Sequence, residues 1–148
     1  SHWPRFVHND SAQFEARLSQ VKCAESPSIL FAGMAGATLP IPVAHGEGKV
    51  QFANASDEAS ALCALRYVDH KGNTTMRYPL NPNGSPHGIA GLCSKDGRHL
   101  AMMPHPERAF IGWQVPWAPA DAGVDPYGPG PWLQMFQNAQ KWAAENGK

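Results

Sequence analysis

The stretch Met102-Met103-Pro104-His105-Pro106-Glu107-Arg108 joins the end of an apolar segment to a histidine held between two prolines. The apolar residues 100–103 predict a buried strand. Proline cannot donate to a sheet ladder, and it biases the residue before it away from helix. We therefore expect the strand to stop at Pro104, with His105 in extended backbone just beyond it. In such a segment, the side chains of His105 and Glu107 fall on one face.

A carboxylate beside an imidazole fixes its tautomer and stabilises its protonated form, as a general base serving a nucleophile requires. His105 and Glu107 are therefore a candidate acid–base pair. A proline-stiffened loop with a solvated histidine and glutamate explains the same residue types, because histidine is not specific to catalysis. The local sequence leaves both interpretations open.

The composition bounds the class of protein. The 148 residues fit one domain, and 12 basic residues balance 12 acidic ones without a basic run, so binding to nucleic acid has no support. No apolar run approaches the roughly 20 residues of a membrane span, and we expect no signal peptide and no membrane partner. The three cysteines lack C-x-x-C spacing, which indicates neither a disulfide framework nor a zinc knuckle and favours a reducing, cytoplasmic location.

Hydrophobic periodicity and turn residues predict a strand-rich chain with one long helix at the end. In residues 14–21, alternation places Phe14, Ala16 and Leu18 on one side of a strand. Prolines confine a strand at 38–44 to an edge or an irregular pairing. The remaining expected elements are a short turn at 29–31, a strand at 50–52, a helical turn or loop at 54–60, hairpins 62–68/74–78 and 88–93/100–103, an irregular excursion at 112–131 and a helix at 131–145.

Two His-x-Glu units, at 45–47 and 105–107, invite a metal interpretation. A third ligand would have to be chosen arbitrarily among the other histidines, so we expect no metal site. The glycines of His45-Gly46-Glu47-Gly48 either let a ligand approach the backbone or form a tight bulge. None of Cys23, Cys63 and Cys93 lies at a helix start or sharp turn, where reactive cysteines are usually found, and we expect each to be a packed residue.

Five motifs, taken in order, resemble a known family. They are Trp3-Pro4-Arg5-Phe6, His45-Gly46-Glu47-Gly48, Leu65-Arg66-Tyr67-Val68-Asp69, Asn81-Pro82-Asn83-Gly84-Ser85-Pro86 and the 102–108 stretch. Together they resemble the C-terminal end of the long, single-chain phosphoribosylformylglycinamidine synthases of purine biosynthesis. That end is a triad-type glutamine amidotransferase domain, and the resemblance covers nearly the whole chain.

The resemblance implies roles for four residues. His105 and Glu107 match the catalytic histidine and glutamate of the Cys-His-Glu triad, and His45 and Gly46 match a stretch that lines the glutamine pocket, largely through backbone groups. The family's nucleophilic cysteine lies upstream of the Trp-Pro-Arg-Phe segment. Residues 1–148 are therefore expected to be a partial domain, the C-terminal half of a class I α/β amidotransferase domain, without glutaminase activity of its own.

For the intact parent, the resemblance implies an ATP-dependent ligase with glutamine as the amide donor. ATP and magnesium would bind to other domains of the synthase, which together with glutamine are the expected partners of this chain. The alternative is a module without a catalytic role, folded only as a packing partner of the remaining half-domain. A glutaminase assay separates the two interpretations.

Overall fold

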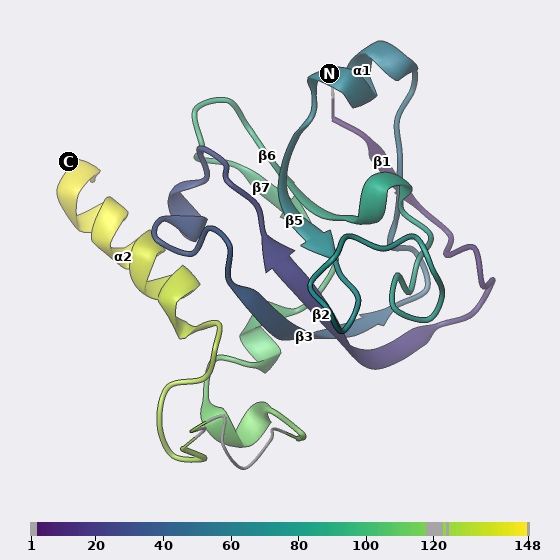
Figure 1. Cartoon of the computed structure of the whole chain (residues 1–148). Helices are drawn as coiled ribbons and strands as arrows, with labels where there is room; N and C mark the ends of the chain where they lie inside the picture. Colours follow the sequence, from purple (N-terminus) through teal and green to yellow (C-terminus); the bar gives the residue numbers. More distant parts are fainter. Residues whose placement is uncertain (1–2, 118–122, 124, 148) are drawn as a thin grey trace.

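An antiparallel sheet of five strands, in the order β3-β2-β5-β6-β7, organises the chain (Figure 1). The computed structural model describes residues 3–117, 123 and 125–147. The sheet strands are β2 (Glu15–Cys23), β3 (Thr38–His45), β5 (Leu62–Tyr67), β6 (Ile89–Cys93) and β7 (Leu100–Met102). A separate pair joins β1 (Arg5–Val7) to β4 (Lys49–Gln51). The α-helices are α1 (Ala55–Ser60) and α2 (Leu133–Asn146), and short 3-10 turns are η1 (Ile29–Phe31), η2 (Pro86–Gly88), η3 (Pro106–Arg108) and η4 (Gly112–Gln114).

The two faces of β2 differ in burial. Its core face carries Glu15, Ser19, Val21 and Cys23, all of which are buried. The opposite face carries the apolar side predicted from the alternation, but there Phe14 is 66% exposed and Leu18 is 37% exposed. The predicted strand is therefore confirmed, but its more apolar face points outward. The side chains of Glu15 and Ser19 point toward the core instead.

Strand β3 lies at an edge of the sheet, as its prolines predicted. It pairs with β2 over eight residue positions, from Glu15 opposite His45 to Lys22 opposite Thr38. At the other edge, the hairpin of β6 and β7 is confirmed, with Gly91 opposite Met102 and Cys93 opposite Leu100. Strand β7 is half-buried rather than buried, because nothing pairs with its outer side in the described sheet.

The predicted hairpin 62–68/74–78 is wrong. Pairing is confined to the turn end, where Val68 forms a bridge with Thr74 and Thr75 N–H donates to the Tyr67 carbonyl over 3.1 Å. Strand β5 pairs instead with β2 on one side and β6 on the other. Since β2 and β6 occupy the hydrogen-bonding edges along most of β5, residues 76–78 do not pair with it and form an irregular excursion.

Helix α2 docks through its first turn and one polar side chain. Trp132, at its N-cap, is fully buried, lies against Phe31 and donates its indole N–H to the Pro40 carbonyl over 2.7 Å. The Nδ2 atom of Asn138 donates to the carbonyls of Leu30 (3.0 Å) and Ala32 (2.9 Å). In Figure 1, the helix (yellow) leads away from the sheet toward the C-terminus. The helix predicted at 131–145 is confirmed.

Backbone hydrogen bonds hold the described residues of the excursion predicted at 112–131. Gly112 N–H donates to the Gly128 carbonyl over 3.0 Å, and Ile111 forms a bridge with Pro129. Its residues 118–122 and 124 lie outside the described residues. Of the helices that the structure does describe, none is both long and apolar enough to cross a membrane.

Candidate active site

His105 and Glu107 are brought together at the end of β7. Nδ1 of His105 lies 2.7 Å from Oε1 of Glu107. The backbone is not extended as expected, because His105 caps the 3-10 turn η3 and Glu107 lies inside it. The turn still places the two side chains in contact. His105 is 28% exposed and Glu107 is 53% exposed, so both are reachable from outside.

The backbone around the pair is fixed on both sides. On the upstream side, His105 N–H donates to the Pro42 carbonyl of β3 over 2.8 Å. On the downstream side, the Gln114 side-chain amide donates to the Glu107 carbonyl over 3.3 Å, and its oxygen accepts from the Phe110 and Ile111 N–H groups, each at 3.0 Å. The predicted pair is therefore held by an edge strand and by the loop that leads to α2.

An ionised carboxylate only accepts hydrogen bonds, so Nδ1 of His105 must carry the proton that it shares with Glu107. In the neutral ring, Nε2 is then an unprotonated base, and within the described residues it has no hydrogen-bond partner. Nε2 of His105 can therefore take a proton from a nucleophile, while the Glu107 carboxylate stabilises the resulting imidazolium.

His45 lies close to this pair, but its side chain is buried and only 5% exposed. Its Nδ1 is 3.3 Å from the Met103 carbonyl, and its Nε2 is 3.3 Å from Nδ2 of Asn83. Burial is the main cause that lowers the pKa of His45 below its ordinary value, and the nearby His105 acts in the same direction. The hydrogen bond to Met103 and the charge of Glu15 oppose this shift.

The backbone of the predicted glutamine-pocket stretch is bound by one asparagine. Asn9 donates its side-chain amide to the His45 carbonyl over 2.8 Å and its N–H to the Gly46 carbonyl over 2.9 Å. The Asn9 side-chain oxygen accepts from Gly48 N–H over 3.0 Å. The carbonyl groups of His45 and Gly46 therefore already have hydrogen-bond partners within the chain. Contact of these two residues with glutamine stays a prediction.

The two His-x-Glu units differ in geometry. In the first, the His45 ring points into the core, and Glu47 instead lies 3.6 Å from the exposed ring of His8. In the second, His105 and Glu107 bind each other directly. Among the described residues, no group of three or more His, Cys, Asp or Glu side chains is placed to hold a metal ion.

A buried polar cluster behind His45 was not recognised from the sequence. The Asn81-to-Pro86 stretch consists of residue types that are typical of exposed turns, yet Asn81, Asn83 and Ser85 are at most 1% exposed. Asn83 donates to Tyr67 Oη over 3.2 Å, and its side-chain oxygen accepts from Ser85 N–H and Oγ–H. Residue type gave no sign of this burial. The one signal in the sequence was that this stretch is among the five motifs that resemble the family.

The three cysteines are packed, as predicted. Cys23 is 1% exposed and Cys93 is 5% exposed, and Cys63 is partly buried. Burial raises the pKa of Cys23 to about 11 and also raises the pKa of Cys63 and of Cys93. A thiol with a raised pKa supplies little thiolate at neutral pH, so none of them suits the role of nucleophile.

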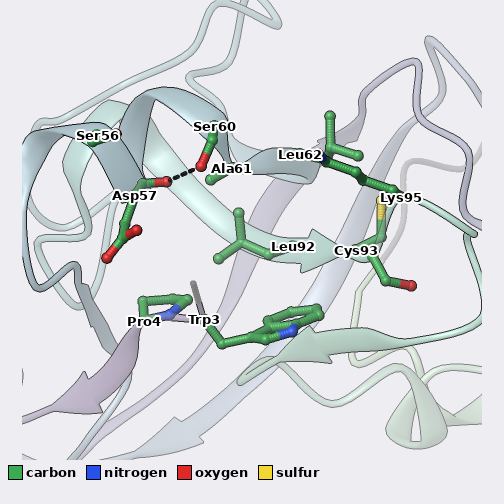
Figure 2. A pocket seen from close by; sticks show the side chains of 11 residues that line it. Trp3, Pro4, Ser56, Asp57, Ser60, Ala61, Leu62, Leu92, Cys93 and Lys95 are labelled. Atoms are coloured by element: carbon green, nitrogen blue, oxygen red, sulfur yellow. Dashed lines mark hydrogen bonds between the residues drawn. The ribbon is translucent and has the colours of Figure 1, made fainter. Parts of the chain in front are cut away.

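An open pocket of about 460 Å³ lies elsewhere, between α1, the start of β1 and the end of β6 (Figure 2). Figure 2 shows Trp3 and Pro4 on one side, Leu92 in the middle, and Cys93 with Lys95 at one end. Its lining includes none of His45, Gly46, His105 and Glu107. The pocket therefore gives Cys93 no access to the candidate acid–base pair.

The strand-rich fold and the contact between His105 and Glu107 agree with the glutamine amidotransferase class that the sequence motifs indicated. Residues 1–143 match the model of the CobB/CobQ-like glutamine amidotransferase domain, and the chain belongs to this family. This finding confirms the amidotransferase resemblance inferred from the five motifs.

A curated relative and a solved structure extend the comparison. The chain is 55% identical over 146 residues to the probable phosphoribosylformylglycinamidine synthase, chloroplastic/mitochondrial, of Arabidopsis thaliana, with 94% of the chain and 10% of the relative aligned. It thus spans about a tenth of that protein. The structure of PurLQS from Thermotoga maritima aligns with this chain at a TM-score of 0.61, and the alignment covers 93% of this chain and 51% of the PurLQS chain. Because the two sequences are only 23% identical, this match supports the fold alone.

Proposed function

We propose that this chain is the part of a glutaminase that supplies the acid–base pair, His105 and Glu107, to a phosphoribosylformylglycinamidine synthase. The observation that carries the proposal is the 2.7 Å contact between His105 Nδ1 and Glu107 Oε1, which leaves Nε2 as the basic atom. The 55% identity to the Arabidopsis synthase supports this choice among amidotransferases. Purine biosynthesis is the corresponding pathway.

The proposed chemistry starts with a cysteine thiol from a part of the parent protein outside this chain. Nε2 of His105 takes the thiol proton, and the thiolate attacks the side-chain amide carbon of glutamine. The tetrahedral intermediate collapses as His105 returns the proton to the departing ammonia. Water, activated by the same nitrogen, then cleaves the thioester and releases glutamate. Glu107 stabilises the imidazolium in both halves of the reaction.

The ammonia would pass inside the protein to a ligase site, where ATP activates the amide oxygen of formylglycinamide ribonucleotide. The acidic, histidine and cysteine side chains described here do not assemble a magnesium site. Following the family resemblance, we assign ATP and magnesium to other domains of the parent, and the residues of this chain would carry only the glutaminase step. The free cysteines suit a reducing compartment, and the cytoplasm expected from the sequence is one such compartment.

A chimera tests the proposal. In it, this chain replaces the matching tenth of the Arabidopsis synthase, and glutamine-dependent formation of the amidine product is measured with ATP. The proposal predicts activity within about ten-fold of the parent synthase, because the chain would complete the glutaminase site. A second chimera carrying His105→Ala is the matched control and should lose the glutamine-dependent reaction.

The structural alternative predicts a different outcome. If the chain served only as a packing partner, the wild-type and His105→Ala chimeras would show the same glutamine-dependent rate. A chimera that makes product from ammonium but not from glutamine, although it is folded, would contradict the proposed glutaminase role.

A further inference from the structure

The buried ring of His45 meets two partners of opposite kind. The Met103 carbonyl can only accept a hydrogen bond, so Nδ1 of His45, 3.3 Å away, must be the donor. On the other side of the ring, the Nδ2 group of Asn83 can only donate, so Nε2, also 3.3 Å away, must accept. Both contacts are satisfied together only by the neutral ring with its proton on Nδ1.

The orientation of the Asn83 amide is itself fixed. Its oxygen accepts from Ser85 N–H over 3.1 Å and from Ser85 Oγ–H over 2.8 Å. An exchanged amide would place its NH₂ group against the Ser85 N–H, which cannot accept. The amide nitrogen of Asn83 therefore faces His45 and the Tyr67 hydroxyl, as the tautomer argument requires.

The backbone around His45 shapes a seat for the ring. A Cβ atom at Gly48 would overlap Nε2 and the adjacent carbons of the His45 ring, so this close approach requires glycine. Asn9 joins the His45 carbonyl to the Gly48 N–H and thereby closes the turn around the ring. Such a site holds one orientation of the imidazole.

The segment that this ring contacts leads directly into the acid–base pair. Two hydrogen bonds attach it to β3 on either side of the buried Pro104: Met103 accepts from the His45 ring, and His105 N–H donates to the Pro42 carbonyl over 2.8 Å. Since His105 is two residues beyond Met103, a shift at the first attachment would be transmitted to its ring.

We propose that His45 is a positioning residue: its neutral, Nδ1-protonated imidazole holds the Met103 carbonyl and thereby sets the placement of His105. The catalytic consequence rests on the proposed glutaminase function, whereas the tautomer and the attachment do not. Burial and the neighbouring His105 both disfavour a charge on His45, so the ring does not compete for the proton that His105 carries.

The first test measures the tautomer in the wild-type chain. Long-range ¹H–¹⁵N NMR on histidine-labelled protein should show His45 with a protonated Nδ1 and an unprotonated Nε2 at neutral pH. A His45 ring protonated at Nε2, or at both nitrogens, would overturn the proposal without any variant. This outcome does not depend on glutaminase activity, so it is separate from a failure of the proposed function.

The second test compares two isosteric variants in the Arabidopsis chimera. The side-chain amide of Asn in His45→Asn can take the place of Nδ1–H and donate to Met103, whereas that of Gln in His45→Gln replaces Nε2 and does not reach Met103. We expect kcat with glutamine to be at least about ten-fold higher in His45→Asn than in His45→Gln, with similar KM, since small misplacements of a catalytic group are costly. The rate with ammonium serves as the control for folding.

Equal loss in both variants, or a loss confined to KM, would show that the ring acts through packing or through glutamine contact and would overturn the positioning role. If the wild-type chimera makes product from ammonium alone, the proposed function fails, and the NMR result still decides the tautomer and the attachment to Met103.

Discussion

Nδ1 of His105 lies 2.7 Å from Oε1 of Glu107, across a 3-10 turn that begins directly after His105. The contact orients the ring so that Nε2 is its basic atom. A third group close by, Arg108, has its Nε 3.8 Å from the same carboxylate oxygen. Because Glu107 is 53% exposed, this ion pair with Arg108 adds little to stability, and the contact with His105 is the one with a chemical consequence.

The isolated chain should release no ammonia from glutamine. All three of its cysteines have a raised pKa because of burial, so none offers an accessible thiolate to His105. The measurement is ammonia release by the purified chain, with Cys23→Ser, Cys63→Ser and Cys93→Ser variants as controls. A rate like that of a complete amidotransferase, abolished by one of these substitutions, would reassign the nucleophile to this chain.

Mild acid should destabilise the chain through His45. Its pKa is lowered from 6.5 by burial, so below about pH 6.5 the unfolded state binds a proton that the native state resists. The free energy of unfolding should therefore fall with decreasing pH, by at most about 1.4 kcal/mol per pH unit, and level off below the native pKa. Above pH 6.5, His45 is neutral in both states and contributes no slope.

Urea unfolding at about pH 5 and about pH 7.5 measures this difference. His45→Asn has no titrating ring and should show a smaller pH dependence than wild type. His70→Asn replaces an exposed histidine and should follow wild type. If His45→Asn kept the full wild-type slope, the buried, neutral state of His45 would be contradicted.

The outer face of β2 should bind a hydrophobic dye and favour self-association. Phe14 is 66% exposed and Leu18 is 37% exposed on this face, and exposed apolar patches promote association. The double variant Phe14→Ser/Leu18→Ser should lower both dye fluorescence and the fraction of oligomer by sedimentation. Tyr127→Ser, at a residue 92% exposed elsewhere, is the control. A wild-type chain that stays monomeric and binds no dye would oppose the interpretation as a partial domain.

Much of the fold could be predicted from local sequence patterns. The prolines in the 38–44 segment placed β3 at an edge, and the apolar segments 88–93 and 100–103 predicted the hairpin of β6 and β7. The hairpin at 62–78 failed because strand pairing is decided by competition among distant segments, and β2 and β6 occupy both edges of β5.

The candidate pair could be predicted from its spacing. His105 and Glu107 are two positions apart, and at this spacing their side chains can meet in extended backbone or, as observed, in a 3-10 turn. The attachment of Met103 to His45 spans 58 residues, and the Asn83 amide that orients the ring comes from a third segment. Burial of turn-type residues such as Asn83 and Ser85 depends on this long-range packing, which local periodicity does not contain.

The most direct measurement is product formation by the Arabidopsis chimera with glutamine and then with ammonium chloride, for wild type, His105→Ala and Glu107→Ala. With glutamine, His105→Ala should lower the rate by about 1,000-fold or more and Glu107→Ala by less, roughly 10- to 100-fold, because His105 carries the proton and Glu107 orients the ring. With ammonium, all three should form product at similar rates. If ammonium fails to rescue folded variants, or if glutamine-dependent rates are unchanged, His105 and Glu107 are not the glutaminase acid–base pair.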